Sequence, residues 1–443
     1  MVDWLKMSAA ELGRGIGAGN IDPVALLDAF FDAIKAHPYY DRIYARLTES
    51  RAHAEAEAAG LRAKAGLRRG VLDGVPISWK DLFDTAGVGT EAGSKLLEGR
   101  VPVADAEVLR NATMAGTVCL GKTHMTELAF SGLGVNPMTA TPPNVNDPAL
   151  APGGSSSGAA TSVAFGLAAA AIGSDTGGSV RIPAAWNDIV GLKTTAGRLS
   201  LKGVVPLAEN FDTVGPLCRT VEDAALLLAS LEGGKPADLA GASLAGMRLA
   251  VLETVAMDDL RDGSARGFEA ALARLAGAGA KIERLRYPVV AEAMALSGAL
   301  IAPEAYATWA DVIEDAPEKM YPLILERFRT GASVSARDHI AGWRRLRQLR
   351  ALWADKVAGY DAVLIPSSAI LPPDAARLLS DPVYFATENL LALRNTRIGN
   401  MLGISALTLP TRAVAGTGIM LMGAAMGEEK LLRVGIAAES ALA

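Results

Sequence analysis

A long stretch without charged residues, from Pro148 to Ser174, constrains this chain more than any other feature. It lies between two aspartates, and the second of them opens the polar sequence Asp175-Thr176-Gly177-Gly178-Ser179-Val180-Arg181. Charged side chains are rarely buried, so a stretch that lacks them entirely is expected to lie in the interior. A small-residue helix followed by an alanine-rich strand would then bring serines near its start close to the serine beyond its end.

A membrane span is the alternative explanation for such a stretch. Pro152 and the run of glycine and serine up to Gly158 interrupt a helix, and the remainder is shorter than the roughly 20 residues that a span requires. The first residues contain no signal-peptide pattern, and the two cysteines, Cys119 and Cys218, lie in apolar surroundings. We expect a cytoplasmic protein with no membrane contact.

Charge and histidine content narrow the classes of ligand. The formal charge of −5 arises from 48 acidic and 43 basic residues without long blocks of one sign, so nucleic acid is not expected as a direct ligand. The four histidines are scattered and show no ligand spacing, so neither a metal site nor a cofactor is predicted. A small molecule is the expected partner, and a homodimer is left open.

Strand and helix patterns alternate after a helical N-terminal region, which predicts an α/β fold. Capping signals at Ser8 and at Asp22-Pro23 open the first helices. We predict one domain over 1–443, with a helical region to about residue 65, a core at about 66–225 and a C-terminal subregion at about 240–443. The further predicted elements are strands at 75–80, 117–120, 168–172 and 247–252, and helices at 105–114, 159–166, from 221 and at 335–358. The last helix carries Ile340, Trp343, Leu346, Leu349 and Trp353 at core spacing.

Two familiar motifs are misleading in this context. Gly116 to Thr123 matches the phosphate-loop pattern, but it follows a predicted helix and contains strand-forming residues. Gly154-Ser155-Ser156-Ser157-Gly158 matches the nucleophile elbow of α/β-hydrolases, but prolines precede it instead of a buried strand. His339 is the only histidine that follows it. We therefore predict neither nucleotide binding nor a histidine-based triad.

Lysine is the remaining candidate for a general base. Lys80 ends a predicted apolar strand directly after Trp79, where water would be excluded from its ammonium group. Burial disfavours the charged form, and moving a lysine pKa from about 10.4 to about 7.5 takes roughly 4 kcal/mol, which burial can supply. Together with serines and a glycine-built anion pocket, this residue indicates acyl-transfer chemistry.

Several motifs occur together in one order, mostly in the first half of the chain. They are Val75-Pro76-Ile77-Ser78-Trp79-Lys80-Asp81, Leu120-Gly121-Lys122-Thr123, Pro152 to Ser156, Gly173 to Pro183, Gly191-Leu192-Lys193 and Asp212 to Val221. With this set the chain resembles the amidase signature family, on the branch that includes the glutaminase subunits of amidotransferases, over nearly its whole length. The resemblance implies a mixed central β-sheet covered by helices on both faces.

The resemblance also implies roles for individual residues. The family's catalytic lysine falls on Lys80, its cis-peptide serine on Ser155 and its nucleophile on Ser179. The backbone N–H groups of Thr176, Gly177, Gly178 and Ser179 would form the oxyanion hole. Ser156, Asp175 and Arg181 would support the site, and Phe130, Leu133 and Trp186 would line the substrate pocket.

The chain departs from the family pattern away from this triad. Ser157 replaces a usual glycine, Thr194 a common proline, and Trp186-Asn187-Asp188 a typical aromatic-Cys-Gly stretch, which affects the expected pocket more than the reaction. We predict hydrolysis of the C–N bond of a small amide, with an aryl amide or a carbamate as candidates. The alternative is the glutaminase subunit of a tRNA-dependent amidotransferase, and an inactive binding relative is less favoured because all three catalytic residues are present.

Overall fold

One continuous mixed sheet of eleven strands runs through the computed structural model, which describes residues 3–443. The strand order is β1-β3-β2-β4-β6-β5-β10-β11-β9-β7-β8. The strands are β1 Tyr44–Leu47, β2 Pro76–Lys80, β3 Val118–Thr123, β4 Ala170–Ser174, β5 Val190–Lys193, β6 Val214–Cys218, β7 Arg248–Leu252, β8 Lys281–Leu285, β9 Ala362–Pro366, β10 Ala406–Pro410 and β11 Gly418–Met422. The α/β expectation with a mixed sheet is confirmed.

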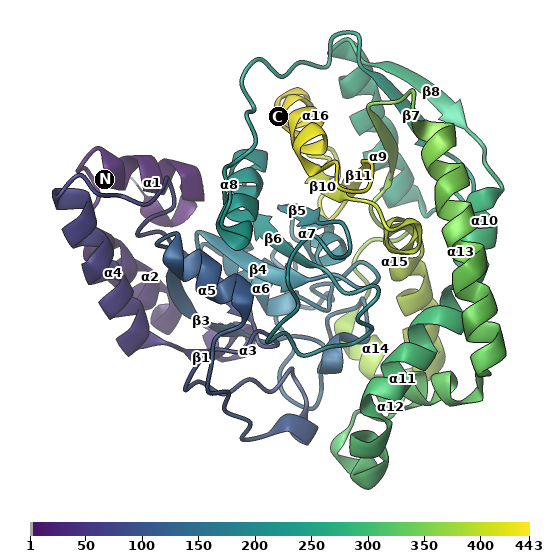
Figure 1. The fold of residues 1–443 in the computed structure, drawn as a ribbon, viewed down its shortest axis with the longest axis horizontal. Helices are drawn as coiled ribbons and strands as arrows, with labels where there is room; N and C mark the ends of the chain where they lie inside the picture. The colour runs from purple at the N-terminus through teal and green to yellow at the C-terminus, as the bar shows by residue number, and fades with distance from the viewer. Residues whose placement is uncertain (1–2) are drawn as a thin grey trace.

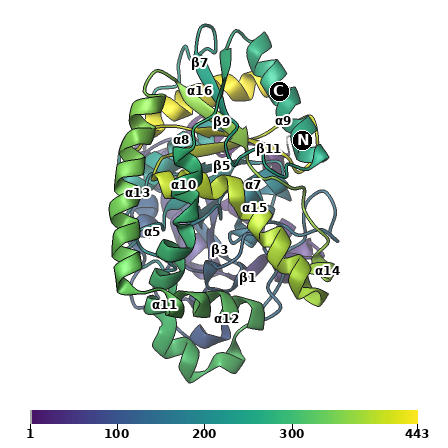
Figure 2. The same cartoon turned by 90° about the vertical axis from the view of Figure 1, so that its right-hand side faces the viewer.

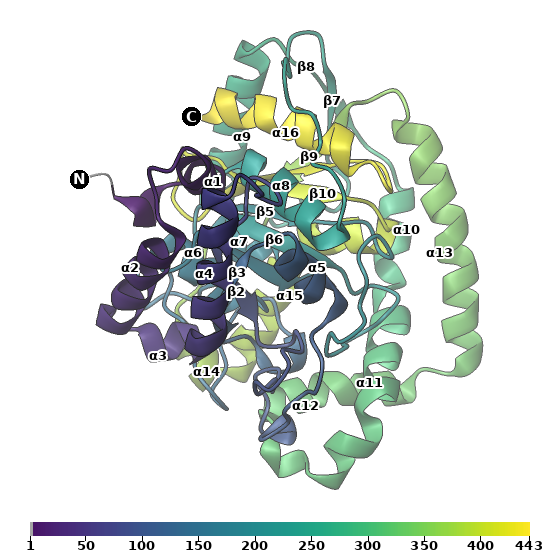
Figure 3. The same cartoon turned by 60° about the vertical axis from the view of Figure 1, so that its left-hand side comes forward.

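Helices surround this sheet (Figure 1). They are α1 Ala9–Gly17, α2 Pro23–Ala36, α3 Tyr40–Ile43, α4 Glu49–Lys64, α5 Glu107–Met114, α6 Ser157–Ala164, α7 Arg181–Trp186, α8 Val221–Glu232, α9 Asp262–Gly277, α10 Val289–Ala295, α11 Ser297–Asp315, α12 Pro322–Arg329, α13 Ala336–Val357, α14 Ala375–Ser380, α15 Pro382–Leu402 and α16 Glu428–Leu442. Figure 2 brings α10, α13 and α15 to the front, and Figure 3 brings α1, α2 and α4 forward on another side. The N-terminal helices and the α10–α15 group therefore cover different parts of the sheet.

The two strands that end at the predicted site, β2 and β4, are neighbours in the sheet. β2 pairs in parallel with both β3 and β4, and β4 pairs antiparallel with β6. Lys80 is the last residue of β2 and Ser174 the last of β4, so parallel pairing brings both ends to the same edge. This edge is where the site forms.

The uncharged segment is buried, as predicted. After a loop it forms α6 and β4, and both elements are enclosed almost completely. It therefore contributes to the interior of the fold. Among residues 3–443, one stretch, Val289–Asp315, which comprises α10 and α11, has the length and apolar composition of a membrane span, and one such stretch is weak evidence for a membrane.

Local signals predicted several helix starts correctly. Ser8 and Glu11 form a capping box at α1, Asp22 caps α2 with Pro23 as its first residue, and Thr220 accepts a hydrogen bond from the amide of Asp223 at α8. Each oxygen binds an amide that the helix itself leaves unpaired.

Two local predictions were incomplete. Short β1 lies inside the region expected to be helical, where it pairs antiparallel with β3 at the sheet edge. In α13, Leu346, Leu349 and Trp353 are buried, but Ile340 is 51% exposed. The segment that matches the phosphate-loop pattern, Gly116 to Thr123, forms β3 over most of its length, as its context indicated. Its Lys122 is buried, with Nζ 2.6 Å from Phe83 O.

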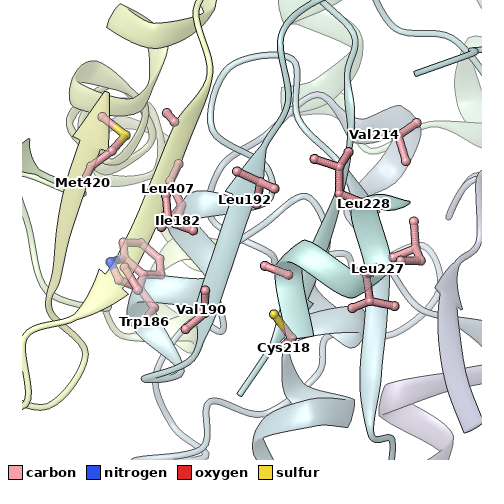
Figure 4. Close-up of a cluster of buried hydrophobic side chains, with 14 of the residues drawn as sticks. Ile182, Trp186, Val190, Leu192, Val214, Cys218, Leu227, Leu228, Leu407 and Met420 are labelled. Atoms are coloured by element: carbon pink, nitrogen blue, oxygen red, sulfur yellow. The ribbon is translucent and has the colours of Figure 1, made fainter. Parts of the chain in front are cut away.

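Buried apolar side chains from both halves of the chain pack between the sheet and its helices. Figure 4 shows part of this core, where Trp186 and Ile182 of α7 lie near Leu407 of β10 and Met420 of β11. Strands from the C-terminal region thus hold the helix that follows the predicted nucleophile.

Candidate active site

Lys80 lies at the centre of a buried cluster of hydroxyl groups. Its Nζ is 2.7 Å from Ser155 Oγ and 2.8 Å from Ser174 Oγ, and its side chain is fully buried. Lys80 is the last residue of β2 and Ser174 is the last residue of β4, so the ends of these two strands position two members of the cluster. Ser155 follows a cis peptide bond after Gly154, and its carbonyl accepts a hydrogen bond from Thr126 N.

The surroundings of Lys80 favour its neutral form. Burial lowers the pKa of Lys80 to about 7, against the opposing influence of Asp175 and Asp212. A lysine in water has a pKa of about 10.4 and is almost entirely protonated at neutral pH. Here a large fraction carries a free lone pair, which a general base requires.

Ser156 ties the start of α6 to both neighbouring segments. Its Oγ donates to Ser174 O at 3.2 Å and accepts from Ser174 N at 3.3 Å, while its backbone N donates to Ser179 O at 3.2 Å. Ser156 thus connects the segment before α6, the end of β4 and the loop that carries Ser179. These hydrogen bonds are the contacts through which the predicted supporting role of Ser156 would act.

Ser179 faces a cavity from the loop between β4 and α7. The residue is 3% exposed, and among residues 3–443 its Oγ forms no hydrogen bond. Lys80, Ser155 and Ser179 are therefore brought into one region, with the lysine–serine contact formed and the contact between the two serines not formed. Catalytic hydrogen bonds are often long in a site without substrate.

Asp175 and Arg181 stabilise the loop that carries Ser179 through hydrogen bonds. The carboxylate of Asp175 accepts hydrogen bonds from Gly178 N at 2.8 Å, Val180 N at 3.1 Å and the guanidinium of Arg181 at 2.8 Å, and both charged side chains are fully buried. Burial alone would raise the pKa of Asp175, but the charge and hydrogen bonds of Arg181 outweigh it and hold that pKa below its usual range. The carboxylate stays ionised and the loop keeps its shape.

The backbone of this loop offers three free donors instead of the four predicted. Gly178 N is engaged by Asp175, so this amide cannot also receive a substrate oxygen, and its place in the predicted oxyanion hole is corrected. Among residues 3–443, no hydrogen bond engages the amides of Thr176, Gly177 and Ser179. Gly178 has another role: its φ is +141° and an ideal Cβ there would lie 2.1 Å from Thr396 Oγ1, so only glycine fits.

A cavity of about 490 Å³ opens above Ser179. Thr176, Gly177 and Ser179 form one part of its wall, while Phe130 and Phe385 contribute aromatic surface. Further lining residues come from α11, α12 and α15. The size and mostly apolar wall suit a small organic molecule.

Two of the three predicted pocket residues do not line this cavity. Trp186 is fully buried, and its Nε1 donates to Ile370 O at 3.3 Å, so it belongs to the core beneath α7. Leu133 is also fully buried, and its carbonyl accepts from Gly153 N at 3.1 Å, which supports the loop before Ser155. Of the three, Phe130 lines the cavity.

Several residues of the site were not predicted. Ser174 contacts Lys80, and Asp212 accepts a hydrogen bond from Thr176 Oγ1 and from Leu207 N at 2.9 Å. Both lie inside quoted motifs, so their nearness to the catalytic segments was the available signal. Arg327 on α12 and Arg397 on α15 also line the cavity, and no motif surrounds them.

Comparisons with known proteins match nearly the whole chain. A family model described as Amidase matches residues 25–432. The 2-amino-5-chloromuconic acid deaminase of Comamonas testosteroni is 35% identical over 98% of this chain and 96% of its own length. A glutamyl-tRNA(Gln) amidotransferase subunit of Saccharophagus degradans is 30% identical over 97% of this chain and 96% of its own length. A crystal structure described as an amidase has a TM-score of 0.88 at 30% identity, covering 99% of this chain and 100% of that one.

Proposed function

The chain belongs to the amidase signature family, and on that premise we propose that it hydrolyses the C–N bond of a small amide through an acyl-enzyme. Ser179 acts as the nucleophile, Ser155 as the proton relay and Lys80 as the base. Hydrolysis of C–N bonds is the general chemistry of the family's amidases, and the finer assignment rests on the geometry around Lys80.

One observation carries the proposal: a fully buried lysine with a pKa of about 7 lies 2.7 Å from Ser155 Oγ, and the residue after Ser155 donates its backbone N–H to the carbonyl of Ser179, which lines the cavity. A neutral amine has one lone pair and can accept the Ser155 proton, while it donates to Ser174 Oγ at 2.8 Å. This arrangement supports a relay in which Ser155 gives its proton to Lys80 and takes one from Ser179.

The reaction proceeds through acylation and then deacylation of Ser179. Ser179 Oγ attacks the amide carbonyl carbon as its proton passes through Ser155 to Lys80. The same proton returns to the leaving nitrogen when the C–N bond breaks, so an amine departs and an ester to Ser179 remains. Water, deprotonated by the same relay, hydrolyses the ester and releases the acid.

Three backbone amides support the developing oxyanion. Thr176, Gly177 and Ser179 present N–H groups that residues 3–443 leave unpaired, on a loop that Asp175 and Arg181 hold rigid. Donors fixed before the reaction stabilise charge without having to reorganise, and loss of one typically costs ~10²–10³ in rate.

A second candidate function is favoured by the relatives. The likeness to an amidotransferase subunit extends over 97% of this chain, so glutaminase activity within a complex is a defined alternative. Glutaminase activity that requires co-purified partner proteins would favour it. Turnover of neutral amides or carbamates by the isolated chain would count against it.

The first prediction tests the nucleophile. Purified protein is offered a panel of amides, carbamates, ureas and glutamine, and the acyl-enzyme is sought by intact-mass spectrometry after rapid acid quenching. We expect an adduct on the wild-type protein and none on Ser179→Ala, because Ser179 faces the cavity next to free backbone donors.

The matched control is Ser440→Ala, which removes an exposed serine hydroxyl from α16. This variant is expected to form the adduct as the wild type does. An adduct of undiminished yield on Ser179→Ala would overturn the assignment of the nucleophile.

A further inference from the structure

Two arginine side chains in the cavity lack a hydrogen-bond or ion-pair partner within the described part of the protein, although the guanidinium of Arg327 lies over the ring of Phe130, 4.6 Å from its centroid. Arg327 and Arg397 both line the cavity, and among residues 3–443 neither guanidinium forms an ion pair or a hydrogen bond. Arg327 Nε is moreover a buried donor without a partner in that range. By contrast, two half-buried arginines elsewhere form ion pairs, Arg51 with Asp105 at 2.7 Å and Arg62 with Asp73 at 2.5 Å.

The two guanidiniums also lie close enough to affect each other. Burial, and then the charge of Arg397, lower the pKa of Arg327 to about 9, while burial lowers that of Arg397 to about 10. Both therefore remain charged at neutral pH. Like charges that are partly desolvated and lack an anionic partner are unfavourable for the folded state, and an anionic ligand bound between them would remove this cost.

Arg397 is next to the nucleophile loop. An ideal Cβ on Gly177 would lie 3.9 Å from Arg397 Nε. Asn389, Leu393 and Arg397 are four residues apart on α15 and all line the cavity, so they share one face of that helix. An anion held by Arg397 would therefore be separated by only a few bonds from a carbonyl at Ser179.

A third unpaired donor belongs to the same helix face. Asn389 Oδ1 accepts from Ser131 Oγ at 3.0 Å and from Gly132 N at 2.9 Å, which fixes the orientation of its amide. Its Nδ2 is buried and has no partner among residues 3–443. Three donor side chains therefore line this cavity. Among residues 3–443, its only lining carboxylate is Glu326, which is exposed and lies 3.4 Å from Arg329.

We propose that the substrate carries a carboxylate, bound by Arg327 and Arg397 a few bonds from the amide that Ser179 attacks. Monoamides of short dicarboxylic acids fit this description, and hydrolysis of glutaramate would consume one water and yield glutarate and ammonia. The guanidinium fork matches a carboxylate with two parallel hydrogen bonds. This inference rests on the proposed hydrolysis for its reaction, but the anion site can be tested separately.

An amino acid fits this cavity less well than a simple acid. Glutamine carries an ammonium group beside its carboxylate, and the two guanidiniums would repel that ammonium group. The one lining carboxylate of the described chain that could attract it, Glu326, is already paired with Arg329. We therefore expect glutaramate to be preferred to glutamine, which differs from it by that group alone.

The kinetic test compares glutaramate with glutaramide, in which a neutral amide replaces the carboxylate. We expect kcat/KM to be ~10–100-fold higher for glutaramate, since hydrogen bonds to charged groups contribute ~1.5–3 kcal/mol. Arg327→Gln and Arg397→Gln should each bring the ratio of the two kcat/KM values towards one. Arg344→Gln, which removes an exposed arginine without an ion pair among residues 3–443, should leave the ratio unchanged.

The binding test does not depend on catalysis. Glutarate is titrated into the Ser179→Ala protein by calorimetry, and its effect on Tm is recorded. Binding that Arg397→Gln abolishes supports the carboxylate site, even if no amide is hydrolysed and the proposed reaction fails. Hydrolysis of glutaramide as fast as glutaramate, with no glutarate binding, overturns the carboxylate site and leaves the amidase proposal intact.

The thermal stability of the Arg327→Gln variant distinguishes a ligand-binding role of Arg327 from a structural one. Arg327→Gln removes the cation–π contact with Phe130 but also the repulsion between Arg327 and Arg397, and no ion pair is lost among residues 3–443, so the Tm of the free protein should change little. A marked fall in Tm, with the glutaramate preference retained, would mean that Arg327 stabilises the fold and would contradict its role in substrate binding.

Discussion

Lys80 and Lys193 are both fully buried, and in both the pKa is lowered to about 7, yet their surroundings differ chemically. Lys80 contacts the hydroxyl groups of Ser155 and Ser174, which can donate or accept a proton. Lys193 donates to the carbonyl oxygens of Thr194 and Ile404, both at 2.8 Å, and carbonyls only accept. Of the two lysines, Lys80 has a neighbour from which it can take a proton.

This difference predicts a pH profile that depends on Lys80. The pKa is lowered, so the protonated form predominates below about pH 7 and the base is available above it. We expect kcat/KM to rise between about pH 6 and pH 8, and Lys80→Met to lower it by ~10²–10⁴-fold and remove the inflection.

Lys193→Met is the matched control, because it removes a second buried lysine with a similar pKa. Its profile should keep the inflection near pH 7, measured with a neutral amide whose own charge does not change. An inflection that disappears in Lys193→Met and persists in Lys80→Met would reverse the assignment of the base.

The residues with distinctive motifs were the ones that sequence could identify. Lys80, Ser155 and Ser179 lie in short segments with unusual composition, and the structure brings them together. Arg327 and Arg397 lie on helices far along the chain with no surrounding motif, so only the fold brings them to the cavity. The hydrogen bond from Gly178 N to Asp175 likewise could not be predicted, because it depends on the conformation of the loop.

At the level of elements, the periodicity of α13 identified a core face but not its extent. Leu346 is fully buried, whereas Ile340, near the start of the helix, is 51% exposed. Figures 1 and 3 show α13 on the outer side of the molecule. Apolar spacing predicts which side of a helix faces the core, but not where the core beneath that side ends.

A pair of substitutions in α13 tests this limit. Leu346→Ala should lower the free energy of unfolding by about 2–5 kcal/mol, because it leaves a cavity in the core. Ile340→Ala should change it by less than about 1 kcal/mol, since half of that side chain is already in water. Urea unfolding followed by circular dichroism measures both, and equal losses would mean that the part of α13 around Ile340 is packed in solution.

At the level of the whole molecule, the two halves of the chain share one sheet and one site. β10 pairs antiparallel with β5, so C-terminal strands continue the sheet begun by the signature core. Arg181 donates to Thr396 O and to Asn400 Oδ1, both at 2.6 Å, and Asn400 Nδ2 donates to Asp175 at 2.9 Å. The loop of Ser179 therefore depends on helix α15.

This sharing predicts that the chain unfolds as a single cooperative unit, as the single domain expected from sequence would. Far-UV circular dichroism, tryptophan fluorescence and amide hydrolysis should be lost at the same urea concentration. Asn400→Ala should shift all three signals together to lower urea, by about 1–3 kcal/mol, because it leaves parts of Arg181 and Asp175 unpaired. Asn210→Ala, at an exposed position, should shift them little. Two separate transitions, with activity surviving the first, would show that the region before residue 240 folds without its C-terminal strands.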